Sequence, residues 1–136
     1  MDRELFEAAR AARERAHAPY SEYPVGAALR TESGAVHAGC NVENASFPEG
    51  WCAETSAIAA MIAASPVESG RRIAAICVVA EPIDGRLTTP CGGCRQRLAE
   101  FSRPDTAVYV ADPDGNSRGF RLGDLLPAAF ALEPRT

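Results

Sequence analysis

The chain has 136 residues, of which 46% are hydrophobic, and this size and composition suit a single domain, 1–136, with a real core. Its formal net charge is -4 and its arginines are scattered rather than gathered into a stripe, so we expect no nucleic-acid partner. Met1–Ala18 is charged and holds no apolar signal core, and no apolar run reaches membrane length, so we expect a soluble, cytoplasmic protein without a membrane partner.

The first third of the chain is predicted to form a helix followed by a hairpin. Apolar residues recur at helical spacing from Asp2 to His17, with charges between them. Apolar density rises again from Tyr23 to Thr31, a turn follows at Glu32-Ser33-Gly34, and Ala35–Val42 resumes in an extended style. These stretches predict one amphipathic helix and two strands joined by a tight turn.

The middle of the chain predicts a buried helix and a central strand. Cys52–Ala64 is rich in alanine, isoleucine and methionine and contains no glycine or proline, which favours a largely buried helix beginning near Cys52. Ile73–Ala80 is a continuous apolar run flanked by charge and by Pro82, which is typical of a strand covered on both faces. We expect this strand near the centre of a sheet.

The last third predicts a further alternation of helices and strands. A helix is expected over Cys91–Phe101, strands over Ala107–Ala111 and near Gly119–Leu122, and a small helix around Leu125. Helices that alternate with strands in this order build layered folds. The predicted fold class is therefore α/β, a three-layer α/β/α sandwich with a mixed sheet of roughly five strands.

Three cysteines are placed to bind one metal ion. Cys91 and Cys94 are separated by two glycines at the start of a predicted helix, and Cys52 begins the other one. The partial positive charge of a helix N-terminus stabilises thiolates, and catalytic zinc usually takes three protein ligands with its fourth position open. The sequence therefore predicts a Zn²⁺ ion, one per subunit, held by Cys52, Cys91 and Cys94.

Two other interpretations of the Cys-x-x-Cys pattern are a redox site and a structural zinc module for protein binding. A structural zinc site needs four protein ligands, but Cys40 and Cys77 fall in predicted strands, where we expect them as small buried hydrophobes. Glu54 follows Cys52 closely enough to exchange protons with a metal-activated water. The alternative for Glu54 is a solvated carboxylate favoured by the helix dipole.

Two motifs together identify a family. With Cys52-Ala-Glu54 and Pro90-Cys-Gly-Gly-Cys94-Arg-Gln96 in view, the chain resembles the small homotetrameric, zinc-dependent cytidine deaminases. The likeness extends to Ala18-Pro-Tyr-Ser21 with Tyr23-Pro-Val-Gly-Ala27, to Cys40-Asn-Val-Glu-Asn-Ala-Ser46, and to Leu125-Leu-Pro-Ala-Ala-Phe130. The resemblance covers nearly the whole chain, so it implies the same fold and a homotetramer.

The resemblance implies a reaction with a nucleoside substrate. Cytidine and 2'-deoxycytidine would be deaminated to uridine and 2'-deoxyuridine, a step of pyrimidine salvage. A zinc-bound hydroxide would attack C4 while Glu54 protonates N3 and then helps ammonia to leave. Asn41 and Glu43 would hold the ribose hydroxyls, and the backbone of Ala53 would contact the base. The alternative for Asn41 and Glu43 is an ordinary turn at the end of a strand.

Three aromatic residues complete the implied binding site. Tyr23 stands where the family commonly has phenylalanine, and its hydroxyl needs a hydrogen-bond partner if it is buried. Phe47 precedes the predicted zinc-binding helix, so both rings are expected to line the nucleoside pocket. Phe130 resembles the aromatic residue that enters the site of a neighbouring subunit. Trp51 receives no role from the sequence.

Thr55 departs from the family pattern, in which arginine usually follows the catalytic glutamate. Three thiolates around one divalent cation leave a net charge of about -1, which makes bound water less acidic. We hypothesise that the helix N-termini, a hydrogen bond from the Thr55 hydroxyl and Arg95 offset this charge. The departure also keeps open an alternative function, the deamination of a modified cytosine nucleoside, as in blasticidin-S deaminase, whose group also lacks that arginine.

Overall fold

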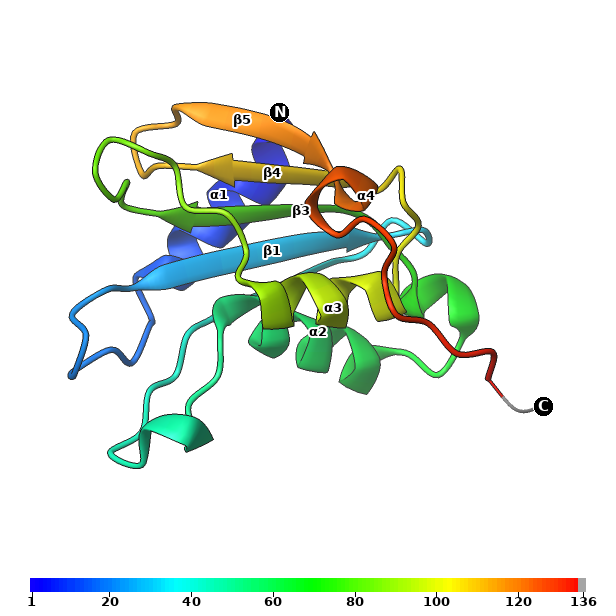
Figure 1. Ribbon diagram of the computed structural model, residues 1–136, viewed down its shortest axis with the longest axis horizontal. Helices are drawn as coiled ribbons and strands as arrows, with labels where there is room; N and C mark the ends of the chain where they lie inside the picture. The colour runs from blue at the N-terminus through cyan, green and yellow to red at the C-terminus, as the bar shows by residue number, and fades with distance from the viewer. Residues whose placement is uncertain (135–136) are drawn as a thin grey trace.

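One mixed sheet of five strands forms the centre of the computed structural model, which describes residues 1–134 (Figure 1). Its strand order is β2-β1-β3-β4-β5, with β3 parallel to β4 and the other neighbours antiparallel. The bounds are β1 (Val25–Thr31), β2 (Val36–Cys40), β3 (Ile73–Ala80), β4 (Ala107–Ala111) and β5 (Ser117–Arg121). The mixed sheet and the central place of residues 73–80 are confirmed.

Helices cover both faces of this sheet. Figure 1 shows α1 (Arg3–Arg13) behind the strands and α2 (Ala53–Ala64) beside α3 (Gly92–Glu100) on the other side. One-turn α4 (Leu122–Leu125) and the 3-10 turns η1 (Phe47–Glu49) and η2 (Glu68–Arg71) complete the elements. The predicted three-layer α/β/α sandwich is therefore confirmed. None of the helices within residues 1–134 is long and apolar enough to cross a membrane.

Strand β3 is apolar throughout because it contributes to two separate cores. Ile76 and Val78 belong to the cluster under α2 and α3, whereas Cys77 and Val79 belong to the cluster under α1. Successive side chains of a strand point to opposite faces, so a central strand between two helical layers cannot alternate apolar and polar residues. This explains how the uninterrupted apolar run revealed the middle of the sheet.

Helix α1 is shorter than predicted. It ends at Arg13 instead of continuing to His17, although the apolar spacing extends further. The backbone of His17 is engaged elsewhere, because its N–H donates to Asn41 O at 3.0 Å and its carbonyl accepts from Glu43 N at 2.8 Å. This pairing with the segment after β2 requires extended backbone at His17, so the helix has to end before it. The same pairing holds the segment that carries Asn41 and Glu43.

Gly26 allows α1 to pack directly on β1. A Cβ atom at this position would lie 1.9 Å from Ala9 O and 2.5 Å from Arg13 N, both on the backbone of α1. We expect Gly26→Ala to lower the free energy of unfolding by about 3 kcal/mol or more, since α1 must move off the sheet. Urea unfolding followed by circular dichroism measures this. Gly119→Ala is the control, because its Cβ would make ordinary contacts of 3.5 Å with Tyr109 and should change stability little.

Candidate active site

The N-termini of two helices bring the three predicted thiols together. Cys52 is the N-cap of α2, Cys91 is the N-cap of α3, and Cys94 lies buried in the first turn of α3. Their sulfur atoms all lie within 4.8 Å of one another. Thiolates are donors that suit Zn²⁺, and three of them leave a fourth position open. The three cysteines therefore fit a zinc ion in a catalytic rather than a structural arrangement.

The three thiols are not chemically equivalent. The Cys94 thiol hydrogen-bonds toward Cys52, which lowers the pKa of Cys52 to about 6 and raises the pKa of Cys94. A thiolate is the form that binds metal, so the lowered pKa of Cys52 favours cation binding at neutral pH.

Glu54 is buried beside the thiols. Its side chain belongs to the first turn of α2, and only 4% of the residue is exposed. Burial raises the pKa of Glu54 to about 7, and the neighbouring Cys52 adds to this shift. The solvated carboxylate considered as the alternative is therefore wrong. A carboxyl group with a pKa near the working pH can both accept and donate a proton, as general acid-base chemistry requires.

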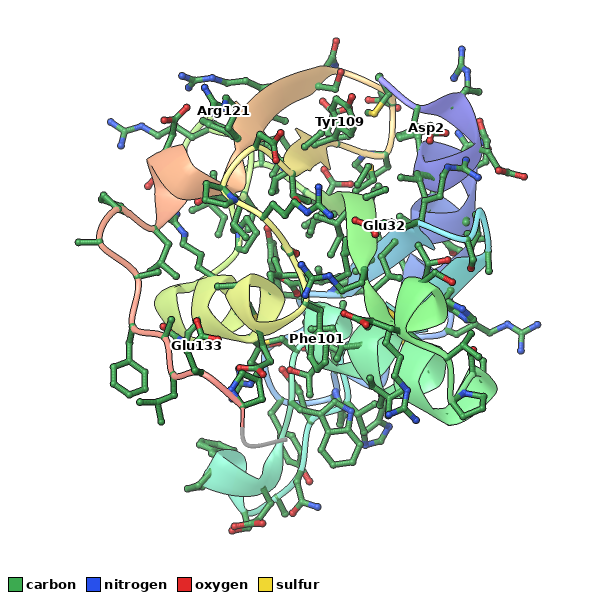
Figure 2. The ribbon with its side chains drawn as sticks, turned by 90° about the vertical axis from the view of Figure 1, so that its right-hand side faces the viewer. Asp2, Glu32, Phe101, Tyr109, Arg121 and Glu133 are labelled. Atoms are coloured by element: carbon green, nitrogen blue, oxygen red, sulfur yellow. The ribbon has the colours of Figure 1, made fainter. Side chains whose placement is uncertain are left out.

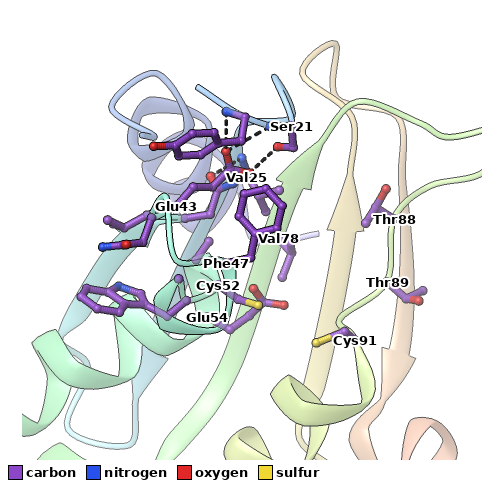
Figure 3. Close-up of a pocket in the computed structure, with 17 residues that line it drawn as sticks. Ser21, Val25, Glu43, Phe47, Cys52, Glu54, Val78, Thr88, Thr89 and Cys91 are labelled. Atoms are coloured by element: carbon purple, nitrogen blue, oxygen red, sulfur yellow. Dashed lines mark hydrogen bonds between the residues drawn. The ribbon is translucent and has the colours of Figure 1, made fainter. Parts of the chain in front are cut away.

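A cavity of about 510 Å³ opens in front of this cluster. Figure 3 shows Cys52, Glu54 and Cys91 at one part of its wall, with Glu43 and Ser21 across from them and Phe47 nearby. The volume lies in the usual range for small-molecule sites. Residues from distant parts of the chain form the wall: Tyr20, Ser21, Val25, Asn41, Val42, Glu43, Asn44, Phe47, Gly50, Trp51, Cys52, Ala53, Glu54, Val78, Thr88, Thr89 and Cys91.

Asn41 is fixed in the wall of this cavity by two hydrogen bonds. Its Oδ1 accepts from Val25 N at 2.9 Å, and its Nδ2 donates to Tyr23 O at 3.0 Å. The amide orientation is thus set by the backbone at the start of β1. Each end of the side chain keeps one further hydrogen-bonding position, because an amide offers two lone pairs and two N–H groups.

Glu43 is held as an anion at the rim. Its carboxylate accepts from the backbone N–H groups of Tyr20 at 3.0 Å and Ser21 at 3.1 Å, and also from the Ser21 hydroxyl. The Ser21 hydroxyl is the main reason that the pKa of Glu43 lies below its usual value. Neither Ser21 nor Tyr20 received a role from the sequence. Their hydrogen bonds to Glu43 add both residues to the candidate site.

The three aromatic residues differ in how they are placed. The hydroxyl of Tyr23 donates to Glu81 O at 2.5 Å and lies 2.5 Å from Thr88 Oγ1, which supplies the partner it was expected to need. Tyr23 is not among the residues that line the cavity. Phe47 lines the cavity with 73% of its surface exposed, and its ring centroid lies 5.7 Å from that of Tyr20. Phe130 lies outside the cavity of its own chain and is 70% exposed.

Neither Thr55 nor Arg95 donates a hydrogen bond to the thiols, so the expected hydrogen bond from the Thr55 hydroxyl is wrong. Thr55 Oγ1 is buried and finds no hydrogen-bond partner among the described residues. The guanidinium of Arg95 donates to Pro90 O at 2.7 Å, to Leu125 O at 2.8 Å and to Thr89 Oγ1 at 3.0 Å. Arg95 therefore braces the loop before Cys91 and offers no hydrogen bond to the sulfurs.

A different arginine reaches the cluster. Arg97 Nη1 donates to Cys94 Sγ at 3.8 Å, a contact that the sequence interpretation missed. The signal was available, because residues three apart on a helix are neighbours on its surface and Arg97 follows Cys94 by that spacing.

Trp51 and two further cysteines complete the surroundings. Trp51 lines the cavity, and its Nε1 donates to Ser56 Oγ at 2.9 Å, which in turn donates to Cys40 O at 2.8 Å. Cys77 is buried as predicted, and burial raises its pKa to about 12. Cys40 is only partly buried, because β2 lies at the edge of the sheet.

A buried carboxyl group beside three clustered thiols, facing an open cavity, defines a site for metal-assisted hydrolytic chemistry. Residues 1–111 match the family model described as "Cytidine and deoxycytidylate deaminase zinc-binding region". The chain belongs to this family. The family model describes a zinc-binding region, and Cys52, Cys91 and Cys94 are placed to hold a metal ion, so both findings support the predicted zinc cofactor.

Known cytidine deaminases are similar to the chain over almost its full length. It is 42% identical over 134 residues to the cytidine deaminase of Halalkalibacterium halodurans, covering 98% of this chain and 97% of that protein. It is 39% identical over 129 residues to that of Sporosarcina psychrophila, with coverages of 95% and 90%. A 1.6 Å crystal structure of cytidine deaminase from Burkholderia pseudomallei superposes with a TM-score of 0.84 at 45% identity, covering 96% and 99%.

Proposed function

We propose that this protein hydrolyses cytidine and 2'-deoxycytidine to uridine and 2'-deoxyuridine with release of ammonia, as a zinc-dependent enzyme of pyrimidine salvage. The observation that carries this proposal is Glu54, buried next to the sulfurs of Cys52, Cys91 and Cys94 at the wall of a nucleoside-sized cavity. The similarity to cytidine deaminases over nearly the whole chain supports the substrate.

Each residue of the cluster has a role in this proposal. Cys52, Cys91 and Cys94 would hold zinc, which when bound makes a water molecule nucleophilic near neutral pH. Glu54 would take one proton from the attacking water and give it to the pyrimidine N3, then take the second proton from the hydroxyl formed at C4 and pass it to the amino group, which leaves as ammonia and leaves the C4 carbonyl of uridine. The first N–H groups of a helix have no partner within the helix, so the backbone amide of Ala53 at the start of α2 can donate to the base.

The ribose end of the site is already ordered before substrate arrives. Asn41 and Glu43 are both held by backbone partners, and each keeps acceptor capacity for a sugar hydroxyl. Binding therefore requires little further ordering of these side chains, and this lowers the entropic cost of recognition. Phe47 at the cavity wall is available to cover the nucleoside.

Loss of cytidine absorbance in the ultraviolet tests the function directly. We expect the zinc-loaded protein to convert cytidine and deoxycytidine, and to leave blasticidin S unchanged. Turnover of blasticidin S alone would favour the alternative deaminase. A zinc-loaded protein that converts none of the three would contradict the proposal and would favour the alternative of a structural zinc module.

We also propose that the enzyme is a homotetramer in which Phe130 of one subunit contacts the site of another. Phe130 and Leu132 are 70% and 79% exposed, and Figure 2 shows their segment running past α3 toward Glu133. Gln96 Nε2 donates to Phe130 O at 3.1 Å, which holds the segment against α3. Neighbouring exposed apolar side chains mark interaction surfaces.

We place this one-domain enzyme in the cytoplasm, where thiols stay reduced.

Shared sites can be tested by mixing two defective subunits. We expect Phe130→Ala and Glu54→Gln to lower kcat/KM separately, because one removes the contributed ring and the other the proton carrier. Co-expressed subunits should form hybrid sites with an intact Glu54 and an intact Phe130, so activity should exceed the mean of the two parents. Activity equal to that mean would contradict the contribution of Phe130 to a neighbour, and sedimentation velocity would report the tetramer independently.

A further inference from the structure

The guanidinium of Arg97 is attached to the proposed zinc site through one sulfur. Its Nη1 donates to Sγ of Cys94 at 3.8 Å, across one turn of α3. Cys94 is the buried member of the thiol cluster, with a relative exposure of 0%. A guanidinium is always charged and is more weakly hydrated than an ammonium. It can therefore donate a charge-assisted hydrogen bond to a thiolate at a small desolvation cost.

Among the described residues no carboxylate forms an ion pair with this guanidinium, although its charge also acts on the nearby Glu54. In the part of the chain that the structure describes, Arg97 forms no ion pair with a carboxylate, and Cys94 Sγ is the one acceptor found for its guanidinium. Glu100 follows Arg97 by one helical turn and shares a hollow with it, but the two do not pair. The positive charge is therefore directed at the thiol cluster.

Gly93 leaves room for this arrangement. A Cβ atom at residue 93 would lie 3.2 Å from Arg97 Nη1 and 3.8 Å from its Cζ, tighter than an ordinary contact at the first of these atoms. A larger residue would press on the end of the arginine that meets Cys94. Gly93, in the first turn of α3, thus leaves space for the guanidinium beside Cys94.

The position after Glu54 opens onto the same place. Thr55 and Arg97 both line a hollow of about 310 Å³ between α2 and α3, together with Ile58, Gln96, Glu100 and Phe101. The short side chain of Thr55 reaches no partner there, since its Oγ1 is buried without a hydrogen bond. A side chain at residue 55 on α2 and the arginine at residue 97 on α3 therefore reach the same part of the molecule.

We propose that Arg97 is a positioning residue of the zinc site, which offsets the negative charge of the three thiolates in place of an arginine at residue 55. The inference rests on the proposed zinc-dependent function. Three thiolates and one divalent cation leave an excess negative charge, and a cation beside Cys94 favours the loaded site. Groups that hydrogen-bond to metal ligands typically change metal affinity or activity by 10–100-fold when they are removed.

Zinc retention and steady-state kinetics of Arg97→Ala test the role. We expect zinc transfer to a chelator from the purified zinc enzyme to increase about 10-fold or more, and kcat to fall while KM for cytidine changes little. Arg97→Lys keeps the charge without the planar donor fork and should lie between Arg97→Ala and wild type. Arg103→Ala is the matched control, because this exposed arginine lies 3.6 Å from Glu32, outside the site, and should behave as wild type.

A relocated arginine separates charge from packing. We expect the double variant Thr55→Arg with Arg97→Ala to recover much of the zinc retention and kcat, and Thr55→Arg alone to gain little. Unchanged retention and kcat in Arg97→Ala would overturn the proposal, as would losses that neither Arg97→Lys nor the double variant repairs. If Arg97→Ala does not fold, Arg97→Gln carries the same test. A wild-type protein that neither binds zinc nor deaminates cytidine would instead disprove the proposed zinc-dependent function, on which this inference rests.

Discussion

Replacement of Glu54 by glutamine is expected to lower kcat for cytidine by at least about 10²-fold while zinc stays bound, since general acid-base groups contribute 10²–10⁴-fold. Glutamine has the size of glutamate, so the buried space beside Cys52 stays filled. It cannot accept a proton from water or return one to N3, which removes the transfer that the reaction needs. The ultraviolet assay gives kcat, and elemental analysis gives the zinc content per subunit.

Glu68→Gln supplies the matched control for this substitution. Glu68 is an exposed residue of η2, away from the cavity, and the same chemical change there should leave kcat unaltered. Retention of at least half of the wild-type kcat by Glu54→Gln would disprove the role of Glu54 as proton carrier. Loss of zinc together with activity would show that Glu54 acts on metal binding instead.

The same substitution has a predictable effect on stability. The pKa of Glu54 is raised from 4.5 to about 7 by burial, so folding opposes its ionisation. An acid with a raised folded-state pKa loses stability as the pH increases from its unfolded value to its folded value. In chelator-treated protein at pH 8, Glu54→Gln should therefore unfold at a higher urea concentration than wild type. Its free energy of unfolding should be about 3 kcal/mol greater. The difference should shrink toward pH 5, and an equal difference at both values would contradict the assigned pKa.

The fold could be predicted closely because its signals are local. The continuous apolar run of residues 73–80 is typical of a strand between two layers, and β3 has these bounds. The uninterrupted stretch after Cys52 became α2, with Cys52 itself as the N-cap. The end of α1 could not be predicted in the same way. It depends on backbone pairing of His17 with residues 41 and 43, which no local spacing encodes.

The same difference between local signals and contacts of distant residues applies to the candidate site. The thiol cluster and Glu54 followed from spacing at helix starts, and their positions within the cluster agree with the prediction. The hydroxyl of Tyr23 meets Glu81 and Thr88, which lie far along the chain, so its place beside rather than within the cavity wall required the tertiary structure. The family pattern places an arginine next to Glu54 on α2, whereas in this chain the arginine that meets the thiols lies on α3, so the motif did not indicate Arg97.

Replacement of Cys91 by serine should remove zinc and activity with little direct cost in packing. Cys91 is the exposed member of the cluster, whereas Cys94 is fully buried, so the smaller hydroxyl at residue 91 leaves no cavity in the core. Serine is a poor zinc ligand beside two thiolates, because its hydroxyl is not deprotonated at neutral pH. Zinc content should fall from about one per subunit to near zero, and kcat should fall with it.

The thermal stability of this variant shows how far zinc supports the fold. Binding to the folded state alone stabilises a protein by about 4 kcal/mol when the ligand is present at 1,000 times its Kd. Without that contribution, Cys91→Ser should melt at a lower temperature than the zinc-loaded wild type and at the same temperature as chelator-treated wild type. Cys40→Ser, outside the cluster, should keep both zinc and activity. A Cys91→Ser protein that retains one zinc per subunit would exclude Cys91 as a ligand, whereas a shared melting temperature with the chelated wild type would assign the whole stability loss to the metal.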